Sequence, residues 1–391
     1  MTGPQNPSLL IVGASCRAAA FSAIRSGFHP VCLDLYADVD LHAVAPAIRV
    51  KDYPSGLVQS LNDVPELPCI YTGALENHAD LLRTLSQRGP LIGNPADIVE
   101  VVRNPLELAR IFEELGLPAL AVRPESDPPP QDGAWIIKPI HSAGGRCIKL
   151  WQPGTQPLGE PHYFQQRAAG DSYSAVFIGP HGRGNVRFVG VTSQLIGDPT
   201  LHAPPFAWCG AVGPVTLSVE AEHLIRRIGN VLSWKCGLSG LFGCDFILDK
   251  DDVPQLTEVN PRYPASAEVL EEVLNLNLMS DHCAVFGLEP PHPRTHSCTP
   301  PHAMGKFLLY SDRDFQAPSP QTWLTPETRP DSTSWSRNLS VADIPAEGEP
   351  FAIGNPICTL YTRGRTPAEC MKQLPELVAN TCQQLFAAAP E

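Results

Sequence analysis

The sequence predicts an α/β domain with a parallel sheet at the amino end, then a larger α+β region and a small β unit. Three observations lead to this prediction. An apolar run at 8–13, a helical segment at 17–25 and a second apolar run at 30–35 follow the order of a parallel βαβ unit. From residue 134 onward, short strand-like runs alternate with glycine-rich turns. The 391 residues, 43% hydrophobic and 18% charged, are typical of a globular protein with two or three subdomains.

The first domain is completed by three further elements. A strand at 69–72 is followed by a helix at 76–87 and a short strand at 90–93. Residues 1–95 are therefore expected to form a small doubly wound domain.

The turn after the first strand offers a candidate substrate site. Its sequence, Gly13-Ala14-Ser15-Cys16-Arg17, lacks the glycine pattern of a dinucleotide-binding turn. A helix amino terminus with Ser15 and Arg17 suits an anionic substrate, and a simple capped turn is the alternative. Glu76 follows another strand at its carboxyl end, where it either pairs with an amine substrate or caps a helix.

The remaining elements are predicted mainly from glycine and proline residues, which commonly end helices and strands. A helix at 105–115 ends at Gly116, and residues 124–133 form a loop. Further along, the pattern predicts a helix at 219–235, surface connections at 287–301 and 312–335, and an amphipathic helix at 366–388.

Charge and cysteine usage exclude several classes of protein. A net charge of −13 leaves no surplus of cations for nucleic acid. The twelve cysteines form no CxxC pair, so neither a zinc site nor a redox motif is indicated. No signal-peptide pattern and no run of membrane-spanning length are found, so we expect a cytoplasmic protein without a membrane partner.

The first motif with chemical content is a lysine that ends a strand before a glycine-rich turn. Lys138 closes the strand 135–139, the small residues 142–145 form the turn, and a return strand follows at 147–150. Backbone N–H groups of such a turn can approach phosphate oxygens while the lysine supplies positive charge. An ordinary flexible hairpin is the alternative.

The second motif is a polar break between two strands at 163–174. Backbone groups at such a break can bind an adenine edge, and its polar side chains can bind a ribose. A plain connection between strands is the alternative.

The third motif is a hairpin with two acidic residues. Apolar alternation on both sides of a four-residue turn predicts that Asp249 faces Pro254, which places Asp245 opposite Glu258. Asn260 then lies on the same face as Glu258. Two carboxylates and an amide oxygen are ligands suited to Mg²⁺. A solvent-facing acidic strand pair is the alternative.

In this order and at these intervals, the three motifs resemble the ATP-grasp superfamily over residues 8–285. The resemblance implies a Rossmann-like pre-ATP-grasp domain at 1–95 and α+β ATP-grasp lobes at 96–286. The lobes divide into a small lobe, 96–164, and a large lobe, 165–286. Residues 287–391 would form a small C-terminal β closure and the terminal helix.

The resemblance also implies roles for individual residues. Lys138 and Arg262 would neutralise phosphate charge and act in catalysis. The metal ligands would be Asp245, Glu258 and Asn260. The nucleotide would be bound by Lys138, by Ser142, Ala143, Gly144 and Gly145 of the flap, and by Gln165, Gln166, Ala168, Asp171 and Ser172 of the hinge.

The carboxyl-terminal runs 305–310 and 353–360 resemble a β closure of predicted carboligases related to biotin carboxylase. Within that group the chain looks most similar to bacterial ATP-grasp proteins of methanopterin- and methanofuran-linked one-carbon metabolism. Two positions depart from the family. The usual second phosphate-binding lysine is replaced by Asn104-Pro105, with Arg103 beside it, and the hinge glutamate is replaced by Asp171-Ser172.

The function implied by the resemblance is an ATP-dependent carboxylate–amine ligase that forms an acyl phosphate. ATP and Mg²⁺ are the expected cofactors, with Mn²⁺ as an alternative metal. The expected partners are a small carboxylate, glutamate as the leading hypothesis, and an amine of a cofactor precursor; a homo-oligomer is compatible with this function. A bicarbonate-using carboligase and a non-catalytic nucleotide-binding protein are the alternatives.

Overall fold

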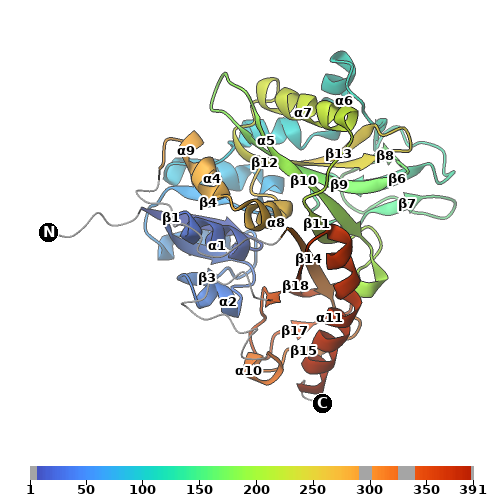
Figure 1. The fold of residues 1–391 in the computed structure, drawn as a ribbon. Helices are drawn as coiled ribbons and strands as arrows, with labels where there is room; N and C mark the ends of the chain where they lie inside the picture. Colours follow the sequence, from blue (N-terminus) through green and yellow to red (C-terminus); the bar gives the residue numbers. More distant parts are fainter. Residues whose placement is uncertain (1–6, 290–301, 325–339, 389–391) are drawn as a thin grey trace.

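The computed structural model describes residues 7–289, 302–324 and 340–388. At the amino end, four parallel strands form a sheet in the order β3-β2-β1-β4 (Figure 1). The strands are β1 (Ser8–Gly13), β2 (His29–Asp34), β3 (Ala47–Arg49) and β4 (Cys69–Tyr71). The predicted α/β class of this region is confirmed.

The helices of this domain are α1 (Arg17–Arg25), α2 (Val39–His42), α3 (Leu57–Ser60), α4 (Ala79–Arg88) and α5 (Ala96–Val102). Two predicted elements differ. The strand expected at 90–93 is only an isolated bridge between Leu91 and Cys69. The helix expected from residue 76 begins at Ala79, because Leu75–Asn77 forms a separate 3₁₀ turn.

A second four-stranded sheet, in the order β5-β8-β6-β7, follows helix α6 (Pro105–Glu114). Its strands are β5 (Val122–Pro124), β6 (Trp135–Pro139), β7 (Lys149–Trp151) and β8 (His162–Gln166). Asn104 caps α6, since its side chain accepts hydrogen bonds from the N–H groups of Leu106 and Glu107, and Pro105 occupies the first helical position. The Asn-Pro pair that departs from the family pattern thus starts a helix.

The largest sheet has eight strands in the order β13-β12-β9-β10-β11-β14-β18-β16. These are β9 (Asp171–Gly179), β10 (Arg187–Ile196), β11 (Trp208–Gly213), β12 (Gly240–Leu248), β13 (Pro254–Asn260), β14 (Ala303–Tyr310), β16 (Val341–Ala342) and β18 (Pro356–Gly364). Helices α7 (Val219–Trp234), α8 (Ala265–Leu274) and α9 (Leu278–Val285) complete the region (Figure 1). The predicted carboxyl-terminal β unit therefore extends the large sheet, because β14 pairs with β11.

The rest of the carboxyl-terminal region is β15 (Phe315–Gln316), α10 (Pro320–Trp323), β17 (Pro350–Phe351) and α11 (Pro367–Ala388). The connection predicted at 312–335 therefore includes β15 and α10 in its described part, and most of the connection at 287–301 lies outside the described residues. Within the described ranges, no helix has the length and apolarity needed to cross a membrane, and no cysteine is in a disulfide. The boundaries at 95 and 286 stay predictions.

One buried ion-pair network joins the three regions of the chain. Arg17, at the start of α1, donates to Glu268 of α8 at 2.5 Å and to Asp343 at 3.0 Å. Lys306 of β14 contacts the other side of Glu268 at 2.7 Å. Burial disfavours ionisation of Glu268, but the charges of Arg17 and Lys306 outweigh it and hold the pKa of Glu268 well below its usual value.

We predict that Glu268→Gln lowers the free energy of unfolding by about 3 kcal/mol at neutral pH, because it leaves two buried cations underpaired. The folded-state pKa of Glu268 is depressed, so its contribution is present above the ordinary glutamate pKa of 4.5 and is lost as the pH falls further. Urea unfolding at several pH values measures this. The exposed pair variant Glu222→Gln is the control, and equal effects of the two variants would contradict the prediction.

Candidate functional site

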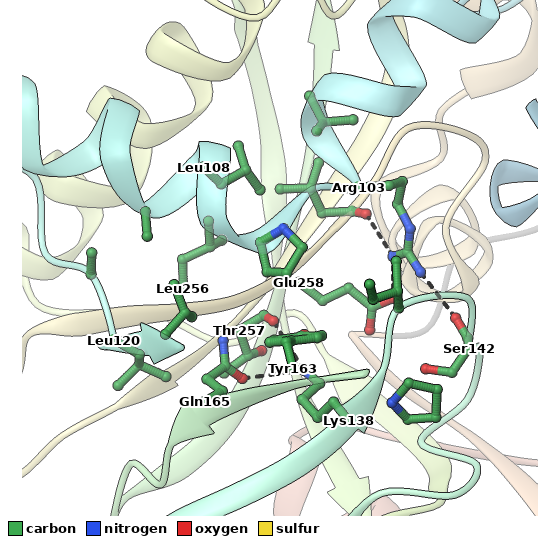
Figure 2. Close-up of a pocket in the computed structure, with 18 of the residues that line it drawn as sticks. Arg103, Leu108, Leu120, Lys138, Ser142, Tyr163, Gln165, Leu256, Thr257 and Glu258 are labelled. Carbon is green, nitrogen blue, oxygen red and sulfur yellow. Dashed lines mark hydrogen bonds and ion pairs between the residues drawn. The ribbon is translucent and has the colours of Figure 1, made fainter. Parts of the chain in front are cut away.

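A pocket lies between the two sheets of the central region, under α6 (Figure 2). Its empty volume is about 720 Å³, part of which is open to solvent. One wall is apolar and is formed by Leu108 and Phe112 of α6, Val122 of β5 and Leu256 of β13. The opposite end is polar. This combination suits a ligand with an apolar ring and a charged tail.

Lys138 projects into the pocket from the end of β6, as the sequence predicts. The residue is 7% exposed, and its ammonium group donates to Gln165 Oε1 and to the carbonyl of Thr257, each at 3.2 Å (Figure 2). The Tyr163 ring centroid lies 5.7 Å from the same nitrogen. A buried ammonium group held by neutral partners can accept an anion without breaking an ion pair.

The hairpin β12–β13 places Asp245 opposite Glu258, as predicted, although the register near the turn differs. Pro254 pairs with Leu248, whereas the sequence pattern predicts Asp249. A β-bulge between the pairs Asp245–Glu258 and Phe246–Leu256 inserts one extra residue on β13, Thr257, which restores the acidic pair. The bulge also leaves the Thr257 carbonyl to accept from Lys138.

The two carboxylates have opposite electrostatic environments. Burial and the charge of Glu258 raise the pKa of Asp245 to about 6. Burial also opposes ionisation of Glu258, but Arg103 and Lys138 hold the pKa of Glu258 below its ordinary value. Asp245 Oδ2 accepts from the Asn260 amide at 3.0 Å, while its Oδ1 is buried without a hydrogen-bond partner.

This donor set fits a divalent cation. An orphaned carboxylate oxygen and a second carboxylate directly across the ribbon are hard oxygen ligands that Mg²⁺ accepts. Asn260 turns its NH2 group toward Asp245 while its oxygen accepts from Arg262, so its amide would have to exchange these bonds to act as the third ligand. Within the described ranges, no three His, Cys, Asp or Glu side chains are grouped so that they could hold a metal. A metal here would therefore be held by two carboxylates and an amide, and its other coordination positions would be filled by water or substrate.

Arg103 connects this acidic pair to the flap. From the end of α5 its guanidinium contacts Glu258 and donates to the Ser142 carbonyl at 2.9 Å (Figure 2). It also donates to Asn77 Oδ1 at 2.9 Å. One arginine thus links the acidic hairpin, the flap and the amino-terminal domain. Arg103 thus places a cation next to Asn104, where the resemblance leads us to expect a lysine.

Arg262 makes a second link to the amino-terminal domain. Its Nε donates to Glu76 Oε1 at 2.9 Å, and its Nη2 donates to Asn260 Oδ1 at 3.1 Å. Glu76 is 3% exposed, and its Oε2 has no hydrogen-bond partner among the described residues. Glu76 therefore pairs with Arg262 and makes no helix-cap hydrogen bond, and one of its buried carboxylate oxygens is left without a partner among the described residues.

The flap rests on the loop before β11. The Trp208 N–H donates to the Gly144 carbonyl at 3.0 Å. Gly145 has a φ of +77°, and a Cβ at this position would lie 1.8 Å from the Phe206 carbonyl oxygen. Only glycine fits there, because a side chain would collide with backbone.

Several predicted nucleotide ligands lie elsewhere. Ser142, Gly145 and Gln165 line the pocket together with Lys138, whereas Ala143 and Gly144 do not. Gln166, Ala168, Asp171 and Ser172 also lie outside the lining. The backbone and side chain of Gln166 bond to Ala121, on the neighbouring strand edge. Their roles at the hinge stay predictions.

The proposed anion site at Ser15 and Arg17 differs from expectation. Arg17 is 2% exposed, and its donors are taken by Asp343, Glu268 and Tyr361. Ser15 donates to Asp343 Oδ1 at 3.3 Å. Carboxylates of the chain itself occupy the positions that an anionic substrate would take, so Arg17 is a structural residue in this arrangement.

The apolar wall of the pocket is the part that the motifs missed. The helical period of α6 places Leu108 and Phe112 on one face, but that pattern equally indicates a core-facing helix. Thr257 was missed because a bulge leaves no distinct mark in the alternation of a short strand.

Comparison with known proteins agrees with this geometry. Residues 103–266 match the family model of the ATP-grasp domain. The formate-dependent phosphoribosylglycinamide formyltransferase of Parasynechococcus marenigrum is 24% identical over 74% of this chain and 78% of its own.

Solved structures agree in fold over nearly the whole chain. The biotin carboxylase domain of Hydrogenobacter thermophilus 2-oxoglutarate carboxylase, solved with MgADP and bicarbonate, has a TM-score of 0.68 at 12% identity. It covers 96% of this chain and 94% of its own. The L-amino acid ligase of Bacillus licheniformis has a TM-score of 0.64 at 16% identity, with coverages of 96% and 98%.

We predict that Asp245→Asn stabilises the metal-free protein at pH 7 by about 1–2 kcal/mol, because the variant removes the repulsion between two buried carboxylates. The same variant should lose the increase in melting temperature that Mg²⁺ produces in the unchanged protein. Thermal unfolding with and without Mg²⁺ measures both effects. Asp251→Asn, at the exposed turn of the same hairpin, is the control. A metal-dependent shift retained in Asp245→Asn would exclude this residue as a ligand.

We also predict that Gly145→Ala weakens nucleotide binding about tenfold, because the flap must move away from Phe206. Gly144→Ala is a matched control: its φ is also positive, at +64°, but a Cβ there meets no atom within 4 Å. Both variants share a backbone penalty of about 1 kcal/mol. Calorimetric titration measures the ATP affinity of each variant. Equal affinities of the two variants would show that the contact between the flap and Phe206 does not affect nucleotide binding.

Proposed function

We propose that this chain, an ATP-dependent ligase of the ATP-grasp superfamily, activates a small carboxylate as its acyl phosphate and transfers the acyl group to an amine. One observation above all supports the proposal: Glu258 lines the polar end of a pocket with an apolar wall, together with Lys138, and Asp245 lies directly opposite Glu258 on the neighbouring strand. ATP and Mg²⁺ are the cofactors that this arrangement suits.

The apolar wall suits the adenine ring, and the polar end suits the phosphates. Lys138 supplies a cation whose present partners are a neutral amide and a carbonyl. Arg103 stands beside Glu258 and the flap, where it supplies the charge that the missing lysine would supply. These cations stabilise negative charge that develops on the transferred phosphoryl group.

Asp245, Glu258 and Asn260 would hold Mg²⁺, which would neutralise phosphate charge when bound. The acidic pair is also a reason to expect that the metal and the nucleotide bind together. Burial and the charge of Glu258 raise the pKa of Asp245, so its ionised form is destabilised, and a bound cation would relieve this.

The reaction balances without a nucleophilic side chain. The carboxylate oxygen attacks the γ-phosphorus as the bond to ADP breaks, which forms an acyl phosphate. The amine nitrogen then attacks the carbonyl carbon, and phosphate leaves with the C–O bond electrons while the amine loses a proton. Arg262 would stabilise the oxyanion of this step, and Glu76 Oε2 would accept a hydrogen bond from the amine.

The flap protects the reactive intermediate from water. Arg103 holds the Ser142 carbonyl, and Gly145 lies against the loop at Phe206. Exclusion of water prevents hydrolysis of the acyl phosphate before the amine arrives.

The names of two similar proteins favour an amine as acceptor. One relative is a formate-dependent formyltransferase acting on phosphoribosylglycinamide, and one structural neighbour is an L-amino acid ligase. Glutamate joined to the amine of a one-carbon cofactor precursor is our leading pair of substrates, on the resemblance noted above.

A bicarbonate-using carboligase is the second candidate, favoured by the biotin carboxylase domain with bound bicarbonate. ADP formation that bicarbonate and biotin stimulate, but that no amino acid stimulates, would favour this candidate. Tight Mg-ATP binding without ADP formation across all acids and amines would favour a non-catalytic protein instead.

The decisive experiment is a phosphate-release screen of amino acids and amines with ATP and Mg²⁺, using Asp245→Ala as the blank. For the active pair, we predict that Glu258→Gln lowers kcat by on the order of 100-fold or more, because it removes one of two carboxylates that face the phosphates. Glu222→Gln, on the exposed face of α7, should keep full turnover. Turnover retained in folded Glu258→Gln would refute the assignment of the acidic pair.

A further inference from the structure

The flap depends on contacts with other regions for its position. Strands β6 and β7 are not paired with each other over residues 138–148, which contain the flap. The hydrogen bonds that the Arg146 and Ile148 N–H groups donate within this segment are 3.4 and 3.5 Å long, beyond the usual range for such bonds. Partners outside the segment therefore decide where the flap lies.

The Ser142 carbonyl makes one of these outside contacts, and it accepts two hydrogen bonds. Asn77 Nδ2 donates to it at 3.1 Å, and Arg103 Nη2 donates to it at 2.9 Å, as Figure 2 shows for the arginine. A carbonyl oxygen has two lone pairs, so its capacity to accept is used in full. The flap is thereby attached both to the amino-terminal domain and to the end of α5.

Asn77 and Arg103 also bind each other. Arg103 Nη2 donates to Asn77 Oδ1 at 2.9 Å, so the two side chains and the Ser142 carbonyl form a closed ring of three hydrogen bonds. We call this ring the flap latch. A guanidinium group only donates and a carbonyl only accepts, so position 77 must supply an acceptor and a donor. The asparagine amide supplies both, on two different atoms.

The turn that carries Asn77 is firmly placed. Leu75 is fully buried, and the Asn77 and His78 N–H groups close the turn with hydrogen bonds of 3.1 and 2.9 Å. Glu76 is 3% exposed and accepts from Arg262 at 2.9 Å. Asn77 is therefore a fixed support, and we expect the flap to be the part that moves when the latch opens.

Asn77 lies outside the pocket, although the other two members of the latch line it. Arg103 and Ser142 are pocket residues, as is Glu258, which Arg103 contacts. Asn77 is not among the lining residues and reaches the flap from the amino-terminal domain. In the proposed arrangement it would touch neither nucleotide nor metal, so any effect on the reaction would be exerted through the flap.

A second attachment holds the flap on its other side, where Gly144 and Gly145 lie against the loop before β11. The flap is thus held between this loop and the turn 75–77. The same turn carries Glu76, where we place the amine. The latch therefore connects the cover of the phosphate site to the element that would hold the second substrate.

We propose that Asn77 is a positioning residue that keeps the flap closed over the acyl phosphate until the amine has reacted. This inference rests on the proposed ligase reaction. With the latch broken, water enters and its oxygen attacks the acyl carbonyl carbon. The C–O bond to phosphate then breaks, phosphate leaves with the electron pair, and the water loses a proton. The carboxylic acid is regenerated, and ATP is consumed without amide formation.

Flap opening can be measured without any substrate by limited proteolysis with trypsin. Arg146 is exposed and is the only lysine or arginine in residues 139–148, so cleavage after it reports on the flap. Asn77→Ala should be cleaved there about tenfold faster than the unchanged protein, because both hydrogen bonds of the amide are lost. Mass spectrometry of the fragment 1–146 identifies the site.

Asn77→Asp separates hydrogen bonding from packing. Aspartate has nearly the same shape and keeps an acceptor for Arg103, but it places an oxygen against the Ser142 carbonyl. It should therefore also be cleaved faster than the unchanged protein, with a similar melting temperature. Asn230→Ala, at an exposed position of α7, is the control and should keep the original cleavage rate. Unchanged cleavage in both Asn77 variants would overturn the proposal.

The second measurement is the ratio of phosphate released to amide formed, for the acid and amine that the phosphate-release screen identifies. The unchanged protein should form equal amounts. Asn77→Ala should raise the ratio about fivefold or more while phosphate release itself changes little, because water competes with the amine. General damage to the fold would instead lower both products together. Equal amounts of phosphate and amide in Asn77→Ala would also overturn the proposal.

The proteolysis uses no ATP, so its outcome is independent of the ligase proposal. Faster cleavage of both Asn77 variants, in a protein that forms no ADP with any acid and amine, would support the latch and refute the ligase proposal alone.

Discussion

The mutual repulsion of two buried carboxylates, Asp245 and Glu258, is the constraint around which the central site is organised. Like charges opposed across an antiparallel ribbon destabilise it unless cations or protons compensate them. In this chain Arg103 and Lys138 act on Glu258, while Asp245 keeps an orphaned oxygen and a raised pKa. The folded protein therefore holds a carboxylate with incomplete charge compensation next to Glu258, which lines the pocket, and this is where we propose that Mg²⁺ binds.

Two arginines connect the acidic hairpin to other parts of the chain. Arg103 ties Glu258 to the flap and to Asn77, and Arg262 ties Asn260 to Glu76. Both Asn77 and Glu76 belong to the same turn of the amino-terminal domain. Hydrogen bonds through Asn260 and Arg262 thus connect Asp245 with Glu76, where we place the amine.

Much of the fold and the centre of the site followed from local pattern. Apolar runs separated by helical segments predicted the parallel sheet, and the hairpin turn predicted the opposition of residues 245 and 258. The register predicted near the turn was wrong by one residue. The bulge at Thr257 compensates for this shift, so Asp245 and Glu258 are paired even though the residues at the turn are not paired as predicted. Arg17 was expected to meet a substrate anion, but residues more than 250 positions away in the sequence supply its carboxylates. No local pattern contains such partners.

The sequence by itself determined which side chains are available for chemistry: a lysine at a strand end, a glycine turn, and acids spaced for one face of a ribbon. Backbone periodicity and turn geometry act over a few residues, so these features can be derived from short segments. Only the tertiary structure decided which charges are satisfied. Arg103 meets Glu258 and Arg17 meets Glu268, because pairing between buried charges depends on how the regions pack together.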